Sequence, residues 1–161
     1  MKVRLRQQSV TIRAPRSVVF ALVSSFGGGV EDGDGAGGPH GENDEGKRLV
    51  ERDGNRLVME FRSRDGRKMY RTLEEVMLYP EERITFRHLE GPLYHSREEF
   101  VFTDMDSGVI MTHNGEIECR MHWLPGAGWA VARFYVKHHY ERLVLRHMNY
   151  LKEQAEGRTP G

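Results

Sequence analysis

The sequence predicts one α+β domain, in which an antiparallel sheet of seven strands packs against a short N-terminal helix and a long C-terminal helix. Three observations lead to this prediction. Six β-type runs follow one another closely between residues 47 and 119, with turn signals between them. A helical pattern without proline or glycine then extends from 129 to 156. The length of 161 residues suits a single domain over 1–161.

The first elements are an opening strand and a short helix. Apolar residues alternate with polar ones between Val3 and Ile12, which predicts a strand, and the alternation changes phase near Gln8. Such a phase change is typical of a β-bulge. Pro15 suits the first position of a helix, and the apolar residues after it recur at helical spacing. We therefore expect a helix from about Pro15 to Phe26.

The segment from Gly27 to Gly46 differs from the rest of the chain. It holds nine of the 18 glycines and six acidic residues, and it has no lysine or arginine. Such a composition buries too little apolar surface to offset the entropy lost on ordering, so we expect a flexible glycine-rich acidic loop over 27–46. The acids also raise the possibility of calcium binding, but their order departs from the pattern of a calcium loop.

Short turns divide the next part of the chain into strands that form an antiparallel meander. Asp53-Gly54 and Asp65-Gly66 are the strongest signals, because both residue types tolerate the positive φ of tight hairpins. The expected strands are 47–52, 56–63, 67–78, 83–89, 94–103 and 109–119.

The last element is a helix of about 28 residues, roughly 40 Å long, which is enough to cross the sheet. Its apolar face carries Val136, Tyr140, Leu143, Val144, His147, Met148 and Leu151. Gly157 is well placed to end it. Because this face would otherwise meet water, the helix must lie against the meander.

The composition excludes several classes of protein. Lysine plus arginine equals aspartate plus glutamate at 24 each, so no overall positive field would attract DNA. Cys119 is the only cysteine, and neither a signal peptide nor a long apolar run is present, so we expect a cytoplasmic protein that is not inserted in a membrane. The spacing of His138, His139 and His147 does not suit zinc. No nucleophile elbow, P-loop or dinucleotide fingerprint is present, and we expect neither a metal nor a cofactor.

This order of elements resembles the START-related superfamily known as SRPBCC, which includes polyketide cyclases, pollen-allergen-like proteins, lipid-transfer domains and coenzyme Q-binding proteins. The likeness covers nearly the whole chain and begins with the segment IRAPRSVVFALVSSF, in which Ala14-Pro15 opens the first helix. The segment from Leu89 to Glu118 is similar to the G-P-[FLY] strand pair of the coenzyme Q-binding and ribosome-associated-toxin branch. The resemblance implies a START-like domain with a helix-grip fold, a seven-stranded curved antiparallel sheet wrapped around the long helix.

Residues on the inner face of such a sheet would line any internal cavity. Alternation along the strands places three polar groups there, His88, Glu98 and His113, which are the candidate catalytic residues. The apolar candidates for ligand contact on the same face are Met59, Phe61, Phe86, Phe100 and Met111. Other interpretations stay open: His88 exposed at a strand end, Glu98 paired with Arg71 or Arg87, and His113 a satisfied core histidine.

The long helix adds further candidates for ligand contact, namely Trp129, Arg133, Tyr140, Leu143 and His147. On a regular α-helical wheel, Arg133 and His147 each lie about 20° from Tyr140, so both would face the sheet. Arg133 would lie near a cavity mouth and hold the polar head of an apolar ligand, unless it ends in water or pairs with the acidic loop. The loop from Trp123 to Trp129 is a candidate gate, or simply anchors the helix start.

Three functional hypotheses follow. The first is that an internal cavity binds or transports a small hydrophobic ligand, a lipid, an isoprenoid or a polyketide-like molecule, the class that the resemblance implies. The second is a cyclase or dehydratase, in which His113 or His88 moves a proton and Glu98 or Arg133 orients a carbonyl. The third is association with ribosomes, because Arg142 and Arg146 lie on the outer face of the long helix and the chain outside the acidic loop is net positive. The ligand and the oligomeric state do not follow from the sequence.

Overall fold

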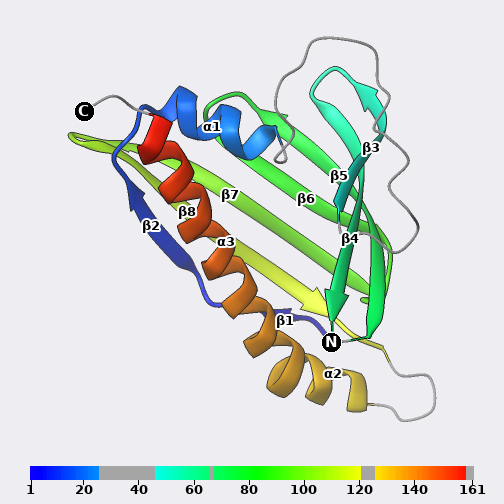
Figure 1. The fold of residues 1–161 in the computed structure, drawn as a ribbon. Helices are drawn as coiled ribbons and strands as arrows, with labels where there is room; N and C mark the ends of the chain where they lie inside the picture. The colour runs from blue at the N-terminus through cyan, green and yellow to red at the C-terminus, as the bar shows by residue number, and fades with distance from the viewer. Residues whose placement is uncertain (26–45, 66, 121–125, 159–161) are drawn as a thin grey trace.

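The computed structural model describes residues 1–25, 46–65, 67–120 and 126–158. Within them, one antiparallel sheet lies over a long helix, and a short helix lies beside it (Figure 1). The sequence prediction of an α+β helix-grip fold is therefore confirmed. Most of the predicted acidic loop over 27–46, and the part of the predicted gate from Trp123 to Pro125, lie outside the described residues.

The sheet follows the predicted meander closely. Its strands are β1 (Val3–Arg4), β2 (Gln8–Ile12), β3 (Gly46–Asp53), β4 (Arg56–Asp65), β5 (Lys68–Tyr79), β6 (Arg83–Glu90), β7 (His95–Met105) and β8 (Gly108–Glu118). Each strand from β3 to β8 pairs with the next in antiparallel register, and both β1 and β2 pair with β8. The opening strand is thus divided in two just before Gln8, where the alternation changes phase.

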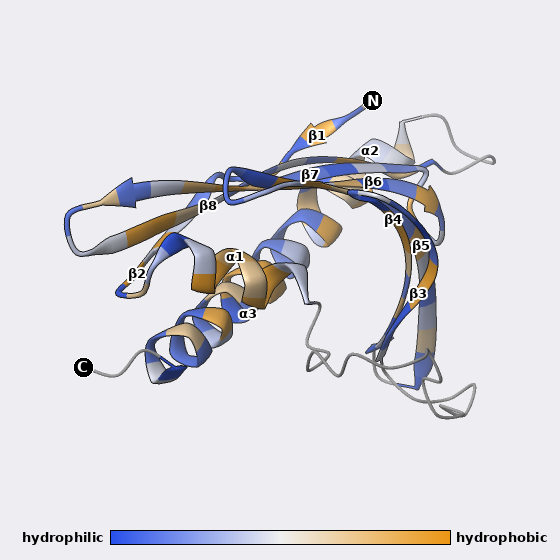
Figure 2. Ribbon diagram, turned by 90° about the horizontal axis from the view of Figure 1, so that it is seen from above, coloured by the Kyte–Doolittle hydropathy of each residue, from blue (hydrophilic) through white to orange (hydrophobic). Residues whose placement is uncertain are grey.

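Four helical segments complete the described fold. Helix α1 spans Arg16–Ser24 and starts directly after Pro15. The long helix consists of α2 (Ala127–Val131), a π-helical turn (Ala132–Val136) and α3 (Lys137–Arg158). Figure 2 shows that α1 and α3 lie on the same side of the sheet, which bends toward that side at β3, β4 and β5. This side is the concave face.

The apolar core lies between the concave face, α1 and α3. The largest fully buried side chains include Ile12, Ile84 and Met111 from the sheet and Met148 from α3. The strand periodicity places the three sheet residues correctly, because alternate residues of each strand reach the same face. No helix within the described ranges is long and apolar enough to cross a membrane.

The π-helical turn corrects one prediction for the long helix. Regular α-helical spacing turns Arg133 toward the sheet, but Arg133 is exposed and Ala132 is completely buried in its place. A π-turn holds more residues per turn than an α-helix, so it shifts the phase of the residues before it relative to those after it. The sequence pattern alone contains no signal for this shift.

The buried stripe of α3 is narrower than the predicted apolar face. Val144, Met148 and Leu151 pack into the core, whereas Leu143 is 45% exposed and His147 is also exposed. The reason is the position of the helix, which packs most closely against β2 and α1. Its opposite flank, which carries Leu143 and His147, is left without close packing against the sheet.

Candidate functional site

A buried polar cluster joins two strands of the concave face to the long helix. One oxygen of Glu98 on β7 lies 2.8 Å from Nε2 of His113 on β8. The Tyr140 hydroxyl on α3 donates a hydrogen bond to the other oxygen at 2.5 Å. Glu98 and His113 are almost completely buried, 7% and 1% exposed. The structure thus brings together two of the candidate catalytic residues and one candidate ligand-contact residue.

The sheet register makes room for this cluster. Glu98 lies opposite Gly115 on β8, and a Cβ at position 115 would come within 2.9 Å of Glu98 Cγ. His113 lies opposite Phe100, and their rings are 5.0 Å apart. A glycine opposite the carboxylate and an aromatic ring beside the imidazole therefore fix the Glu98 side chain where Tyr140 can reach it.

The proposed pairing of Glu98 with Arg71 or Arg87 is wrong, because these arginines lie on the opposite, convex face. Arg71 binds Glu60 with an N–O distance of 2.6 Å, and Arg87 binds Glu75. Both glutamates accept hydrogen bonds from more than one arginine, and these contacts hold the pKa of each carboxyl below its usual value despite desolvation. The arginines of the convex face are therefore occupied by its own acids.

Glu74 on β5 is a second acid of the concave face, and the sequence analysis did not single it out. Its side chain is half-buried, and it forms no hydrogen bond or ion pair with any described residue. Burial, together with the nearby negative charge of Glu98, raises the pKa of Glu74 to about 7. This carboxyl can therefore both hold and release a proton near neutral pH.

His88 lies next to Glu74 on the concave face, because the two residues are register partners on β5 and β6. The pairing shifts between Leu73 and Glu74, which marks a β-bulge at this point. Burial lowers the pKa of His88, although a hydrogen bond with the Leu93 backbone opposes the effect. His88 is half-buried, so the interpretation of a fully exposed histidine does not describe it.

The apolar candidates surround these polar groups on the sheet. Met59 is the register partner of Glu74 on β4, and Phe86 is the register partner of Glu98 on β6. Phe86 packs edge-on against Phe100, with ring centroids 5.9 Å apart. Met111 is fully buried, and Phe61 is partly buried against the core. The concave face thus places apolar side chains on both sides of the two carboxyl groups.

The candidates on the long helix divide into two groups. Tyr140, Leu143 and His147 lie on the flank that turns away from the contact with β2. Partial desolvation of the His147 ring lowers its pKa, and the positive charge of nearby Lys47 on β3 lowers it further. Trp129 and Arg133 are not part of this group, because both are exposed near the helix start. There the Arg133 guanidinium lies 5.8 Å from the centroid of the Phe134 ring.

The titratable side chains of the concave face differ in whether they could exchange a proton with a ligand. Glu74 can donate a proton to a carbonyl or accept one from a hydroxyl, because both of its protonation states are populated near pH 7. Tyr140 stays protonated, since burial and the charges of Glu98 and Glu74 hold its pKa well above the usual value. His113 is enclosed in the core, where it fixes Glu98. Within the described ranges, no three His, Cys, Asp or Glu side chains gather as metal ligands would.

Comparison with known proteins supports the fold but not a particular activity. No family model and no curated protein matches the sequence. Among solved structures, the Zhui aromatase/cyclase from a Streptomyces species matches with a TM-score of 0.73 at 17% identity, covering 100% of this chain and 98% of that chain. A protein from Thermus thermophilus matches with a TM-score of 0.71 at 20% identity, covering 99% and 100% of the two chains.

A START superfamily protein from Mycobacterium smegmatis also matches, with a TM-score of 0.58 at 16% identity over 97% of both chains. These likenesses agree with the SRPBCC resemblance of the sequence and show that the chain shares the helix-grip fold. At such identities they say nothing of individual site residues.

Proposed function

We propose that the protein binds a small, mainly apolar molecule on the concave face of its sheet, and that a carbonyl or hydroxyl group of this ligand bonds to Glu74. The ligand would lie between β4, β5 and β6 and the flank of the long helix that carries Tyr140, Leu143 and His147. The helix-grip fold shared with an aromatase/cyclase supports a ligand of polyketide-like or lipid-like character.

The observation that carries this proposal is the Glu74 carboxyl, which is partly buried and has no hydrogen-bond or ion-pair partner within the described residues. Solvent still reaches part of this side chain, and a ligand that displaces this water must replace its hydrogen bonds. A ligand oxygen would supply the missing partner. The surrounding apolar side chains would contribute about 25 cal/mol for each Å² of apolar ligand surface that they remove from water.

Two measurements test ligand binding. The first is native mass spectrometry of the gently purified protein, with extraction of any bound lipid or aromatic compound. The second is the affinity for a fluorescent hydroxylated anthraquinone, a planar apolar molecule with both carbonyl and hydroxyl oxygens. We expect the affinity to change with pH around 7 in the wild type, and this pH dependence to disappear in Glu74→Gln.

Glu75→Gln is the matched control, because Glu75 is the next residue but lies on the opposite face. It should keep the pH dependence of binding. Binding that is equally pH-dependent in Glu74→Gln would contradict the role of Glu74. The absence of both a copurified ligand and any binding of the anthraquinone or a fluorescent fatty acid would contradict ligand binding itself.

A cyclase or dehydratase activity is the second candidate function, and the pKa of Glu74 favours it. As a carboxylate, Glu74 would remove a proton from a carbon between two carbonyl groups, so that this carbon could attack another carbonyl within the same molecule. The resulting alkoxide would take this proton back from the Glu74 carboxylic acid and become a hydroxyl. For dehydration, the Glu74 carboxylate would remove the second proton of the same carbon and give it to the hydroxyl, which leaves as water as the carbon–carbon double bond forms. In this proposal Glu74 would take the proton-transfer role that the sequence hypothesis gave to His113 or His88; His113 is only 1% exposed.

The test is turnover of a short poly-β-ketone thioester. Glu74→Gln should abolish cyclisation while the affinity for the anthraquinone at pH 6 changes only a few-fold. His88→Asn is the companion variant, because His88 neighbours Glu74 in the register. Turnover that survives in Glu74→Gln would exclude this residue as the proton acceptor.

A further inference from the structure

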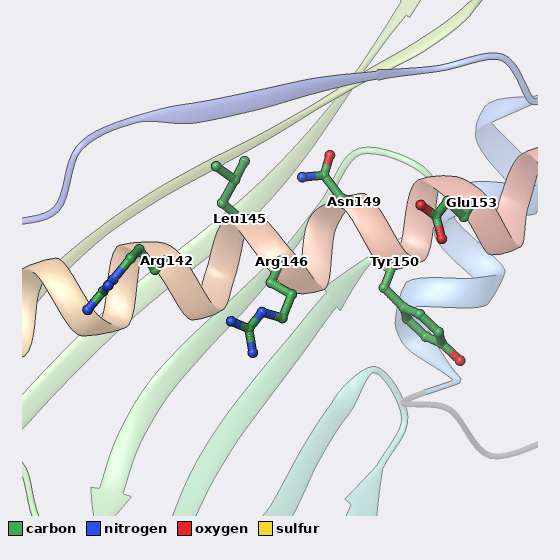
Figure 3. A pocket seen from close by; sticks show the side chains of 6 residues that line it. All are labelled: Arg142, Leu145, Arg146, Asn149, Tyr150 and Glu153. Atoms are coloured by element: carbon green, nitrogen blue, oxygen red, sulfur yellow. The ribbon is translucent and has the colours of Figure 1, made fainter. Parts of the chain in front are cut away.

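The side of the long helix that faces away from the sheet carries an unusual mixture of exposed residues. Phe134 is 67% exposed, Tyr135 is 68% exposed and Tyr150 is 55% exposed. Figure 3 shows that Arg142, Leu145, Arg146, Asn149, Tyr150 and Glu153 lie together along this side of α3, which is open to solvent. We call the exposed side chains of Phe134, Tyr135, Arg142, Leu145, Arg146 and Tyr150 the outer helix face.

The arginines of this region have no acidic partners within the described residues. Arg133, Arg142 and Arg146 form no ion pair there. On the convex face of the sheet, by contrast, Arg48, Arg62 and Arg71 all bind the single carboxylate of Glu60, and other arginines bind Glu75. Five arginines of the convex face are therefore paired with its acids, whereas Arg142 and Arg146 share their side of the helix with one acid, Glu153, and keep a net positive charge there.

The sequence of the helix strengthens this asymmetry. Residues 127–150 contain four lysines or arginines and one acid, Glu141. Glu141 is already engaged by Lys137 at 3.6 Å and by the backbone N–H of Arg6. The outer helix face thus combines exposed aromatic and aliphatic side chains with basic ones, and Tyr and Trp rings are enriched at the headgroup level of membranes.

We propose that the outer helix face docks on the surface of a bilayer that contains anionic lipids. The stretch from Phe134 to Tyr150 is about 24 Å long and forms a ridge, which suits a flat surface. The arginines would bind lipid phosphates, while the exposed aromatic rings enter the headgroup region. A symmetric dimer fits less well, because it would place Arg142 and Arg146 near their own copies.

The test is flotation of the full chain with two kinds of vesicle, one of phosphatidylcholine alone and one of phosphatidylcholine mixed with phosphatidylglycerol. We expect binding only to the vesicles that contain phosphatidylglycerol, and weaker binding as salt increases. Because each basic residue near an anionic surface contributes about 1 kcal/mol, Arg142→Gln with Arg146→Gln should weaken binding about 30-fold. Phe134→Ser with Tyr135→Ser should weaken it about tenfold or more.

The control is Arg52→Gln with Arg97→Gln, which removes the same charge from exposed positions of the sheet. This control should bind vesicles within a few-fold of the wild type.

Equal loss of binding in the control and the Arg142/Arg146 variant would overturn the proposal, as would equal binding to neutral vesicles or no binding to either kind. Self-association, or ribosome binding that the arginine variant abolishes while vesicles are not bound, would assign the face to a different partner and also overturn it. The outcome does not depend on the ligand site proposed above.

Discussion

Glu74 and Glu75 are neighbours in the same strand, yet they lie in opposite electrostatic environments. Glu75 points to the convex face, where Arg56 and Arg87 bind it and lower its pKa. Glu74 points to the concave face, where burial and the nearby charge of Glu98 raise its pKa to about 7. Successive side chains of a β-strand point to opposite faces, and this alone is sufficient to give two adjacent glutamates different pKa values. The acids of the convex face form structural ion pairs, whereas Glu74 on the concave face stays available to bind a ligand or a proton.

The largest effect should come from breaking the buried pair of the concave face. His113→Ala removes the partner of one Glu98 oxygen and leaves a cavity in the core. Loss of one member of a buried pair costs about 3–5 kcal/mol. The free energy of unfolding of His113→Ala in urea should fall by this amount. His95→Ala is the control, because it removes an imidazole–glutamate pair that remains partly exposed. A loss of similar size in both variants would contradict the special role of burial.

A smaller effect is expected from the hydroxyl of Tyr140. Tyr140→Phe removes the hydrogen bond to Glu98 but keeps the ring in place. Hydrogen bonds to charged groups contribute about 1.5–3 kcal/mol, so urea denaturation should show a loss of about 2 kcal/mol. Tyr150→Phe, at an exposed position of the same helix, should leave stability within about 0.5 kcal/mol. An unchanged stability of Tyr140→Phe would mean that this contact contributes little.

The pH dependence of stability separates the two adjacent glutamates. The pKa of Glu74 is higher in the folded protein than the ordinary value of 4.5, so the folded state holds its proton more tightly and loses stability as pH rises from about 4.5 to about 7. Glu74→Gln removes this loss and should stabilise the protein at pH 8 by about 1–2 kcal/mol, reduced from the full shift because solvent reaches part of the side chain. At pH 4 it should have almost no effect.

Glu75 should behave in the opposite way. Its pKa is lowered by the arginines, so it stabilises the fold at neutral pH and this stabilisation is lost as pH falls below about 4.5. Glu75→Gln should therefore lower the melting temperature at pH 7 and have a smaller effect in acid. Melting temperatures of both variants measured between pH 4 and pH 8 test the comparison directly. Parallel curves for the two variants would show that the faces do not differ.

The smallest effect should come from the convex face itself. Arg87→Ala breaks an ion pair with Glu75 while Arg56 remains bound to the same carboxylate. Exposed ion pairs contribute about 0–1 kcal/mol, so unfolding in urea should show a loss below about 1 kcal/mol, and salt should reduce it further. A loss that exceeds the effect of Tyr140→Phe would reverse the proposed ranking of the two faces.

Much of the architecture could be predicted from the sequence, because it depends on local signals. Turn residues such as Asp53-Gly54 define the hairpins, and the period of two places Glu98 and His113 on the same face as Phe100. The site was harder to predict. The Glu74 pKa depends on burial and on the nearby charge of Glu98, and both depend on how the strands and the helix come together. The partners of Glu98 depend on which strands and helix meet, which is a property of the tertiary structure.

The π-helical turn at 132–136 determines how the long helix would respond to the insertion or deletion of one residue. One inserted or deleted residue there would rotate the preceding turns by about 100° about the helix axis and leave the later turns seated as before. Trp129 and Val131 would then point in new directions without any repacking around Met148. The turn thus separates two parts of the core: such a change would displace buried Gly128 and Ala132 at the helix start, while Met148 keeps its place.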